Sequence, residues 1–450
     1  MGRVVVVGAG RSGLGAAGHL AASGREVVLT EGKPGPDPAA AELLSNLGVL
    51  AVWGSHPLCL LDDCEEVVLS PGVSPAIPFA QEAAARGIPV TGELELAHRA
   101  LRARGDGAVI LAVTGTNGKS TTTDLTAHLL KTSGLPTRAC GNLGIPLVEA
   151  IAGAEPGTRF ALECSSYQLE TVRDFKAEAA AALNLTPDHL ARHGTLEAYR
   201  AAKVRIFQHQ TPEDLRLTPL ADPAFEALAP GHGLSARFGW TCPDGPGAWC
   251  DDHGTLWLRD THGEHPLVNR SRLLIPGDHN VENALAAAVL AERGGAELDA
   301  IREGLRTYPG LAHRIALCGE RDGVEAYNDS KGTNVDATLI AIRALPGPLV
   351  LLLGGQGKGT GYGPLRGALE GKLRRLIFLG EDIPRLEADL GDLPHTSIQA
   401  FDEAVEAALA LAEPGDQVLL SPACASFDQF RNFEARGERF EALVKAWSRG

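Results

Sequence analysis

One short segment constrains the fold of this chain more than any other, because a strand, a glycine-rich loop and a helix follow one another in it. Residues 108–113 are apolar and predict a buried strand, and a helix is expected from about residue 121 to residue 133. Between them lies Gly115-Thr116-Asn117-Gly118-Lys119-Ser120. Glycines let backbone N–H groups approach phosphate oxygens, and the start of a helix adds positive potential. The segment predicts an α/β domain that binds a nucleotide through its phosphates.

Two side chains of this loop suit a nucleotide bound with magnesium. Lys119 can neutralise the β- and γ-phosphates, and the Ser120 hydroxyl can ligate Mg²⁺. The strict P-loop spacing would place another glycine at position 113, where this chain has Val113, so the loop is a variant. A strand-to-helix turn without a ligand is the alternative interpretation. The ATP-binding residues predicted in this segment are Gly115, Thr116, Asn117, Gly118, Lys119, Ser120 and Thr121.

A phosphate loop normally works with a carboxylate at the end of a neighbouring strand. Residues 159–162 predict such a strand, and Glu163 follows it directly. Glu163 is therefore a candidate magnesium ligand. The alternative is an acid that merely ends a strand at the surface.

The first residues repeat the same pattern with a different loop. Residues 4–7 predict a strand, Gly8-Ala9-Gly10-Arg11-Ser12-Gly13 follows, and Glu31 ends the next expected strand. This arrangement passes the dinucleotide-binding fingerprint, in which a pyrophosphate lies at the start of a helix. Taken alone, the segment also allows an NAD-dependent oxidoreductase.

Alternating strands and helices continue to the end of the chain and predict parallel sheets. Further strands are expected at residues 26–29, 66–69, 179–183, 324–327, 349–353, 376–379 and 417–420. The segment with Trp240, Trp249 and Trp257 predicts β-hairpins, and a helix is expected around residues 283–293. We expect an α/β protein of three domains: a Rossmann-like domain over residues 1–97, a P-loop-type ATPase domain with a mostly parallel sheet over 98–309, and a Rossmann-like domain over 310–450.

Composition excludes several other classes of protein. The chain has 56 acidic against 41 Lys and Arg residues, a net charge of −15, which argues against a nucleic-acid partner. The longest apolar runs are too short to span a bilayer, so no membrane association is expected. Eight scattered cysteines without a CxxC pair, together with the absence of a cleavable leader, predict reduced thiols and a cytoplasmic location.

Beyond the phosphate loop, a series of motifs resembles the Mur ligases, enzymes of peptidoglycan synthesis with three α/β domains. The motifs are Gly115 to Thr121, Glu163-Cys164-Ser165-Ser166, Asn184-Leu185-Thr186-Pro187-Asp188-His189, Tyr199-Arg200-Ala201-Ala202-Lys203, Gly277-Asp278-His279-Asn280, His313-Arg314 and Asn328-Asp329-Ser330-Lys331. Residues 163–170 and 421–430 are most similar to the branch of the family that adds D-glutamate to UDP-N-acetylmuramoyl-L-alanine.

The resemblance implies an ATP-dependent ligase that forms an amide through an acyl phosphate. Lys119, Lys203 and His189 are the implied catalytic residues, and two Mg²⁺ ions are the implied metals. The implied metal ligands are Ser120, Glu163, His189 and Lys203, the last as a carbamate formed with carbon dioxide. A carbamate turns a cation into an anion with two oxygens, which suits magnesium. Without the resemblance, Lys203 would be an ordinary helix-surface lysine.

The resemblance also implies which residues bind the substrates. The protein is expected to be a monomer. The positions implied for the UDP-linked substrate are Arg11, Ser12, Gly72, Asn142 and His189. Those implied for the rest of ATP are Asn280, Arg314 and Asp329, and those for D-glutamate are Lys331, Thr333, Lys358, Ser426 and Phe433. After Lys358 the family tends to show an acid and then an aromatic residue, whereas this chain has Gly361-Tyr362.

Three alternatives stay open from the sequence. A sister ligase that adds another amino acid, or a folate-type glutamate ligase, would share most of the motifs. An NAD-dependent oxidoreductase would explain the N-terminal loop. A non-catalytic nucleotide-binding regulator would explain the phosphate loop, although the presence of Lys119, Glu163, Lys203 and Lys358 together argues against it.

Overall fold

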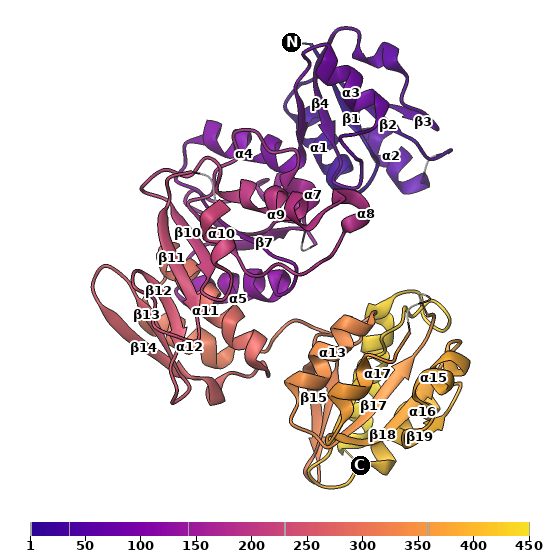
Figure 1. Ribbon diagram of the computed structural model, residues 1–450. Coiled ribbons are helices and arrows are strands. Elements are labelled where there is room, and N and C mark those ends of the chain that lie inside the picture. Colours follow the sequence, from indigo (N-terminus) through magenta and orange to yellow (C-terminus); the bar gives the residue numbers. More distant parts are fainter. Residues whose placement is uncertain are drawn as a thin grey trace. The chain divides into compact units, whose positions relative to one another are not determined.

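The chain contains three β-sheets with helices packed on them, as the α/β prediction requires (Figure 1). The computed structural model describes residues 2–35, 37–142, 144–228, 231–357, 359 and 361–449. The chain forms two compact units. The first contains residues 1–272 and 281–307, and the second contains residues 273–280 and 308–450. The first unit holds two of the sheets and the second unit holds the third.

The N-terminal sheet has five parallel strands in the order β3-β2-β1-β4-β5. Its strands are β1 (Arg3–Val7), β2 (Val27–Glu31), β3 (Leu50–Trp53), β4 (Cys64–Leu69) and β5 (Val90–Gly92). Its helices are α1 (Arg11–Ala22), α2 (Pro38–Asn46), the 3₁₀ turn η1 (Leu58–Leu61) and α3 (Pro78–Ala85).

Strand β1 shows why both faces of this sheet carry helices. Val4 and Val6 pack with residues of α1 and α2, whereas Val5 and Val7 pack with Phe79 of α3. Successive side chains of a strand point to opposite faces, so an unbroken run of valines must be buried on both sides.

The central sheet has nine strands in the order β14-β13-β12-β11-β10-β9-β6-β8-β7. Its strands are β6 (Val109–Thr114), β7 (Thr137–Gly141), β8 (Arg159–Glu163), β9 (Ala179–Ala182), β10 (Leu215–Pro219), β11 (Leu234–Gly239), β12 (Gly247–Cys250), β13 (Thr255–Arg259) and β14 (Glu264–Asn269). The associated helices and turns are α4 (Glu93–Arg104), α5 (Lys119–Thr132), α6 (Leu147–Ala150), α7 (Ser166–Leu169), α8 (Leu190–His193), α9 (Leu196–Val204), η2 (Arg205–Phe207), α10 (Pro223–Leu228), η3 (Arg270–Arg272), α11 (Asp278–Arg293) and α12 (Leu298–Thr307).

The expected hairpin is present at one edge of this sheet. Strands β12, β13 and β14 pair antiparallel, and Trp249 lies opposite Trp257 with stacked rings 5.9 Å apart. From β7 to β12 the neighbouring strands pair parallel. The predictions of a mostly parallel central sheet and of hairpin strands at Trp249 and Trp257 are therefore confirmed. Trp240 lies outside the hairpins, because it follows β11, which pairs parallel with β12.

Helix α4 joins the first two sheets into one unit. Its Leu94, Ala97 and Leu101 belong to a core that contains Val4 and Val6 of the N-terminal sheet. The same core contains residues of β6 and β8 in the central sheet. The boundary expected at residue 97 stays a prediction, and it falls within this continuous helix.

The third sheet has the order β15-β16-β20-β17-β18-β19, with β15 antiparallel to β16 and the other pairs parallel. Its elements are β15 (Ala316–Arg321), β16 (Val324–Asn328), α13 (Val335–Ala344), β17 (Leu349–Gly354), α14 (Leu365–Leu369), β18 (Leu373–Leu379), α15 (Ile383–Leu390), β19 (His395–Ser397), α16 (Phe401–Leu411), β20 (Gln417–Leu420) and α17 (Phe433–Arg449).

Strand β17 lies in the middle of this sheet and is buried on both faces. Leu349, Leu351 and Leu353 pack with α13, α14 and α15, whereas Val350 and Leu352 pack with α16 and α17. The sheet therefore has helices on both sides. In the described part of the chain, no helix is long and apolar enough to cross a membrane.

Glycine 13 allows α1 to start close against the preceding loop, and this gives a test of the N-terminal fold. A Cβ atom at Gly13 would lie 2.0 Å from the Gly8 carbonyl oxygen. We predict that Gly13→Ala lowers the midpoint of thermal unfolding, by the equivalent of about 1–3 kcal/mol, because backbone atoms must shift.

The matched control is Gly18→Ala in the same helix. A Cβ atom there would meet only Leu47 Cδ1 at 3.5 Å, an ordinary contact. Alanine is favoured over glycine within helices by about 0.5–1 kcal/mol, so the midpoint should stay unchanged or rise. Equal losses in the two variants, measured by differential scanning calorimetry, would contradict this account of Gly13.

Candidate active site

The phosphate loop joins β6 to α5 as the sequence predicts, with the helix beginning at Lys119 rather than at residue 121. Gly115 and Gly118 have φ angles of +154° and +81°. A Cβ atom at Gly118 would lie 2.3 Å from Asn283 Oδ1. Asn184 binds the loop from the end of β9, because its carbonyl and side-chain oxygens accept from the N–H groups of Thr116 and Asn117 at 3.0 and 2.8 Å. The loop is thus tightly held at the carboxyl end of the sheet.

Two lysines converge on one backbone oxygen of this loop. Lys119 Nζ donates to the carbonyls of Gly115 and Thr116 at 3.0 and 2.8 Å. Lys203 Nζ, from α9, donates to the same Gly115 carbonyl at 2.7 Å. The structure therefore brings together two predicted catalytic residues that lie 84 positions apart in the sequence (203 − 119).

Lys203 is buried, with 1% of its surface exposed. Its ammonium lies 4.4 Å from the ring centroid of Tyr199, one helical turn earlier in α9. The pKa of Lys203 is lowered to about 7, first by burial and then by the positive charge of Lys119. A buried lysine with this pKa holds a substantial neutral fraction near pH 7, unlike an ordinary surface lysine.

Glu163 ends β8 and is almost fully buried. Its Oε1 accepts from Asn142 Nδ2 at 2.7 Å, and the Glu163 backbone carbonyl accepts from the Asn142 N–H at 2.9 Å. Glu163 Oε2 is buried and has no hydrogen-bond partner among the described residues. The Glu163 charge also acts on Lys203 and favours its protonated form. An unpaired carboxylate oxygen beside a phosphate loop fits a bound cation.

His189 lies in a cluster of rings next to Lys203. Its Nδ1 is 3.1 Å from the Tyr167 hydroxyl, and its ring centroid is 5.0 Å from Tyr167 and 6.1 Å from Tyr199. His189 has a φ of +53° at the start of α8. His193 belongs to the same cluster, because its ring centroid lies 5.1 Å from that of Tyr199. Burial lowers the pKa of its imidazole.

The N-terminal loop and the turn after β4 form a second group of predicted residues. A Cβ atom at Gly8 would lie 2.8 Å from Ser70 Cβ, so the loop starting at Gly8 and the turn that carries Gly72 are neighbours. Arg11 begins α1, followed by Ser12, and the Arg11 guanidinium lies 3.6 Å from the carboxylate of Glu149. These predicted diphosphate contacts therefore lie at the carboxyl ends of β1 and β4.

Glu31 is bound by the backbone of its neighbours. Its two carboxylate oxygens accept from the N–H groups of Ala9 and Lys33 at 2.9 and 3.0 Å. These hydrogen bonds outweigh its burial, so the pKa of Glu31 is lowered. The acid that completes the dinucleotide fingerprint thus shapes the glycine loop itself.

In the second unit, Asp329 lies at the end of β16. Its Oδ2 accepts from Ser421 Oγ at 2.7 Å. Burial raises the pKa of Asp329 to about 7, against the positive charge of the nearby Arg314. The third residue implied for ATP in this unit, Asn280, donates from Nδ2 to the carbonyl of Pro276 at 2.7 Å.

Four of the five residues implied for D-glutamate are described, and Lys358 lies outside the described residues. Lys331 Nζ is 5.4 Å from the ring centroid of Phe433. Thr333 donates its N–H to the carbonyl of Lys331 at 2.8 Å, and Ser426 is buried at the segment after β20.

Arg436 of α17 is a residue of this region that the sequence interpretation missed. It is 1% exposed and donates to Ser330 Oγ and to the carbonyls of Ser330, Cys424 and Ala425 at 2.8–3.3 Å. It thereby ties the segment after β16 to the segment after β20. No local signal in the sequence distinguishes it from the exposed arginines of the same helix.

Tyr362 occupies the place where the sequence departs from the family pattern. It is 1% exposed, and its hydroxyl contacts Asp382 Oδ2 and lies 2.9 Å from Cys424 Sγ. The Tyr362 N–H donates to Asp389 at 2.7 Å. The hydroxyl, together with Asp382, fixes the end of this loop in a chain that lacks the usual acid at Gly361.

We predict that Arg436→Met lowers the thermal stability of the C-terminal sheet, because several buried carbonyls lose their donor. Each buried group left unpaired costs about 1–3 kcal/mol. Arg439→Met is the control, since Arg439 lies on the same helix and pairs with Asp402 at the exposed surface. That exposed pair is worth at most about 1 kcal/mol. Hydrogen exchange of β16 and β20 would report the difference, and equal protection in both variants would contradict it.

Comparison with known proteins agrees with this geometry. Three family models match: "Mur ligase MurD-like, N-terminal domain" at residues 2–92, "Mur ligase middle domain" at 113–291 and "Mur ligase, glutamate ligase domain" at 313–424. The chain belongs to the Mur ligase family.

Two relatives that match nearly the whole chain carry the same name. The UDP-N-acetylmuramoylalanine–D-glutamate ligase of Anaeromyxobacter dehalogenans is 41% identical, over 99% of this chain and 98% of that protein. The ligase of the same name from Myxococcus xanthus is 42% identical, over 99% and 98%.

Solved structures support the fold. The UDP-N-acetylmuramoylalanyl-D-glutamyl-2,6-diaminopimelate–D-alanyl-D-alanyl ligase of Acinetobacter baumannii aligns with a TM-score of 0.60 at 17% identity, over 93% of this chain and 90% of that chain. The UDP-N-acetylmuramate-alanine ligase of Thermotoga maritima aligns with a TM-score of 0.56 at 18% identity, over 99% and 100%.

Proposed function

We propose that this protein joins UDP-N-acetylmuramoyl-L-alanine to D-glutamate in an ATP-dependent reaction of peptidoglycan synthesis, releasing ADP and phosphate. The convergence of Lys119 and Lys203 on the Gly115 carbonyl, close to Glu163, is the observation that carries the proposal. Full-length relatives at 41–42% identity, named for this reaction, support the choice of substrates.

The positive charges suit the first half of the reaction. The alanyl carboxylate attacks the γ-phosphorus of ATP, giving an acyl phosphate and ADP. Two anions must approach each other in this step, so catalysis depends on cations and on positioning. Lys119 and the start of α5 would hold the β- and γ-phosphates. Asn280, Arg314 and Asp329 would bind the rest of the nucleotide.

The residues present fit magnesium. Mg²⁺ usually takes one or two protein carboxylates and completes its shell with phosphates and water. The described residues contain no cluster of three or more acidic, histidine or cysteine side chains that could hold a metal, so phosphate oxygens would supply much of the shell. Glu163 Oε2, buried and unpaired, and the Ser120 hydroxyl would hold one ion. When bound, magnesium would neutralise phosphate charge and polarise the transferred phosphoryl group.

We propose a second magnesium ion, held by His189 and by Lys203 as a carbamate. Carbon dioxide would add to the neutral Lys203 amine, forming an N–C bond while the nitrogen releases a proton. The lowered pKa of about 7 and the burial of Lys203 support this step, since only the unprotonated amine is nucleophilic. Carbamate formation would also remove one of two neighbouring positive charges.

In the second half, the amine of D-glutamate attacks the acyl phosphate and phosphate leaves. Lys331, Lys358, Thr333, Ser426 and Phe433 would bind D-glutamate, with the lysines opposite its carboxylates. Arg11, Ser12, Gly72, Asn142 and His189 would contact the UDP-linked substrate. We propose that the protein works as a monomer in the cytoplasm, where ATP is supplied.

The mechanism predicts that Lys203→Ala abolishes measurable turnover, because the proposed carbamate cannot form. Short carboxylic acids such as acetate or propionate should restore part of the activity by occupying the space of the carbamate. ADP release with all substrates and magnesium present measures this. Rescue should be absent in Lys119→Ala, which lacks the phosphate-binding ammonium. Normal turnover of Lys203→Ala without added acid would rule the carbamate out.

The amino-acid substrate is tested by single-turnover reactions with labelled D- and L-glutamate and other amino acids. We predict product with D-glutamate, and at least about tenfold less with L-glutamate, because a pocket that pairs two carboxylates fixes the direction of the amine. Equal use of L-glutamate, or a preference for a different amino acid, would assign the chain to another branch of the family.

A further inference from the structure

Two side chains of helix α4 form hydrogen bonds at the two ends of the short helix α6. Glu93 Oε1 accepts from the Val148 N–H at 2.7 Å, at the start of α6. Eleven residues later (104 − 93), Arg104 donates to the carbonyls of Ile151 and Ala154 at 2.9 and 2.8 Å, just past its end. A carboxylate at the start and a guanidinium at the end are the charges that the peptide dipoles of a helix favour.

Of Glu93 and Arg104, Glu93 lies in the more unusual environment. It is 2% exposed, and its second oxygen, Oε2, has no hydrogen-bond partner among the described residues. Burial raises its pKa to about 7, against the hydrogen bond from Val148. Burying an acid of this kind lowers the stability of the fold unless hydrogen bonds compensate for the water that it loses.

Gly141, the last residue of β7, and Asn142, which follows it toward α6, both contact Glu163. The Gly141 N–H donates to the carbonyl of Ile145 at 2.7 Å. A Cβ atom at Gly141 would lie 2.2 Å from the Glu163 carbonyl oxygen, so no side chain can separate Gly141 from β8. Asn142 then donates to Glu163 Oε1 at 2.7 Å.

We infer that Glu93 is a positioning residue for Glu163. By fixing the start of α6 it holds residues 144–146, and through the hydrogen bond between Gly141 and Ile145 it holds Gly141 and Asn142, so that Asn142 binds Glu163 Oε1 and leaves Oε2 for magnesium. This inference rests on the proposed role of Glu163 as a magnesium ligand. Partners that orient a metal ligand affect metal affinity even when they do not touch the metal.

Glu95, two residues further along α4, provides a matched control. It is 1% exposed, and its Oε2 accepts from the N–H groups of Arg173, Asp174 and Phe175 at 2.7, 3.0 and 3.1 Å. It therefore holds the turn before β9, and within the described part of the chain its carboxylate accepts hydrogen bonds from that turn alone. Removing its carboxylate breaks more hydrogen bonds than removing that of Glu93.

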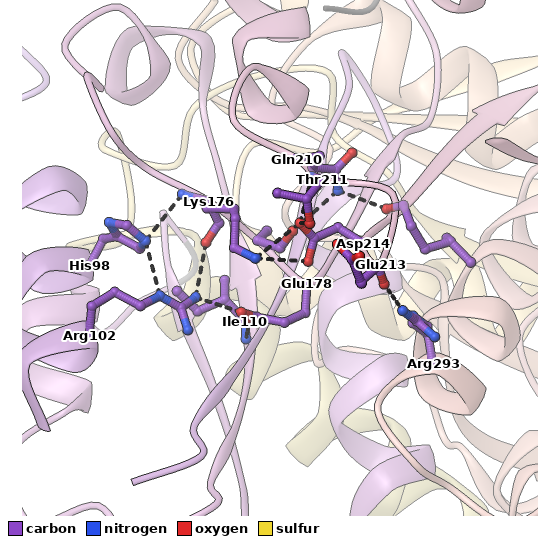
Figure 2. Close-up of polar contacts among 12 residues, drawn as sticks. His98, Arg102, Ile110, Lys176, Glu178, Gln210, Thr211, Glu213, Asp214 and Arg293 are labelled. Atoms are coloured by element: carbon purple, nitrogen blue, oxygen red, sulfur yellow. Dashed lines mark hydrogen bonds and ion pairs between the residues drawn. The ribbon is translucent and has the colours of Figure 1, made fainter. Parts of the chain in front are cut away.

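Further along α4, His98 and Arg102 contact the segment that leads into β9, as Figure 2 shows. His98 Nε2 accepts from the Lys176 N–H at 3.3 Å, and Arg102 pairs with Glu178 at 2.7 Å. Glu178 in turn accepts from the Ile110 N–H at 2.8 Å, at the start of β6. Glu95 belongs with this group, which supports the strands, whereas Glu93 and Arg104 bind the start of α6 and the residues just after its end.

The test measures Mg²⁺ binding directly, by titrating MgCl₂ into the full-length protein saturated with ADP and following the heat released. Glu93→Ala should raise the Mg²⁺ dissociation constant about three- to tenfold, less than the loss of a direct partner of a ligand. Glu93→Gln keeps an acceptor for Val148 and should stay within about twofold of the unchanged protein. Glu95→Ala should lower the midpoint of thermal unfolding without changing Mg²⁺ affinity.

A double-mutant cycle distinguishes a positioning role of Glu93 from a general loss of stability. Asn142→Ala should weaken Mg²⁺ binding, and adding Glu93→Ala to it should cause little further loss, because both act through one contact. Should Glu93→Ala fail to fold, Glu93→Asp shortens the side chain by one methylene, keeps its charge, and carries the same prediction. Unchanged Mg²⁺ affinity in folded Glu93→Ala or Glu93→Asp, or an equal loss in Glu95→Ala, would overturn the inference.

Glu163→Gln distinguishes this inference from the proposed function. If Glu163→Gln leaves Mg²⁺ affinity unchanged, the proposed metal role of Glu163 is wrong. If Glu163→Gln weakens binding while Glu93→Ala does not, the metal role stands and only the positioning role of Glu93 fails.

Discussion

Two ammonium groups that share one carbonyl oxygen are the constraint on which the rest of this site depends. Lys119 and Lys203 both donate to Gly115, although like charges at such a distance repel. The protein tolerates the arrangement because the loop is held by Asn184 and because the pKa of Lys203 is lowered to about 7. An anionic ligand, or conversion of one lysine into an anion, removes the repulsion. This arrangement supports the proposals that the site binds phosphate and that Lys203 changes its charge.

The scaffold explains how such a site is kept in place. The parallel strands β6, β8 and β9 place Thr114, Glu163 and Ala182 at the carboxyl end of the central sheet. Each of these residues is followed by a segment that enters the site. Helix α4 is continuous with the core of two sheets and binds the backbone of the segments that follow β7 and α7. The same logic recurs in the second unit, where Arg436 ties together the segments after β16 and β20.

The sequence predicted many of the buried parallel strands and the two glycine loops, because these have local signals. The run at residues 4–7 and the segment 108–120 were sufficient for this. The sequence did not predict β3, β5, β7, β10, β15 and β19. Tyr199 could have been found, since it lies one helical turn before Lys203. Three features could not be predicted: the support of the phosphate loop by Asn184, the role of Arg436 and the hydrogen bond from α6 to Glu93. Each depends on a contact between residues 55 or more positions apart. The roles of the individual site residues stay predictions until the reaction is measured.

The central claim is that the carboxylate of the UDP-linked substrate takes the terminal phosphoryl group of ATP. The direct measurement uses UDP-N-acetylmuramoyl-L-alanine labelled with ¹⁸O in its carboxylate, with ATP, D-glutamate and magnesium, followed by mass spectrometry of the phosphate released. An acyl phosphate passes one carboxylate oxygen to phosphate, so each phosphate should carry one ¹⁸O. Amide product accompanied by unlabelled phosphate would contradict the account.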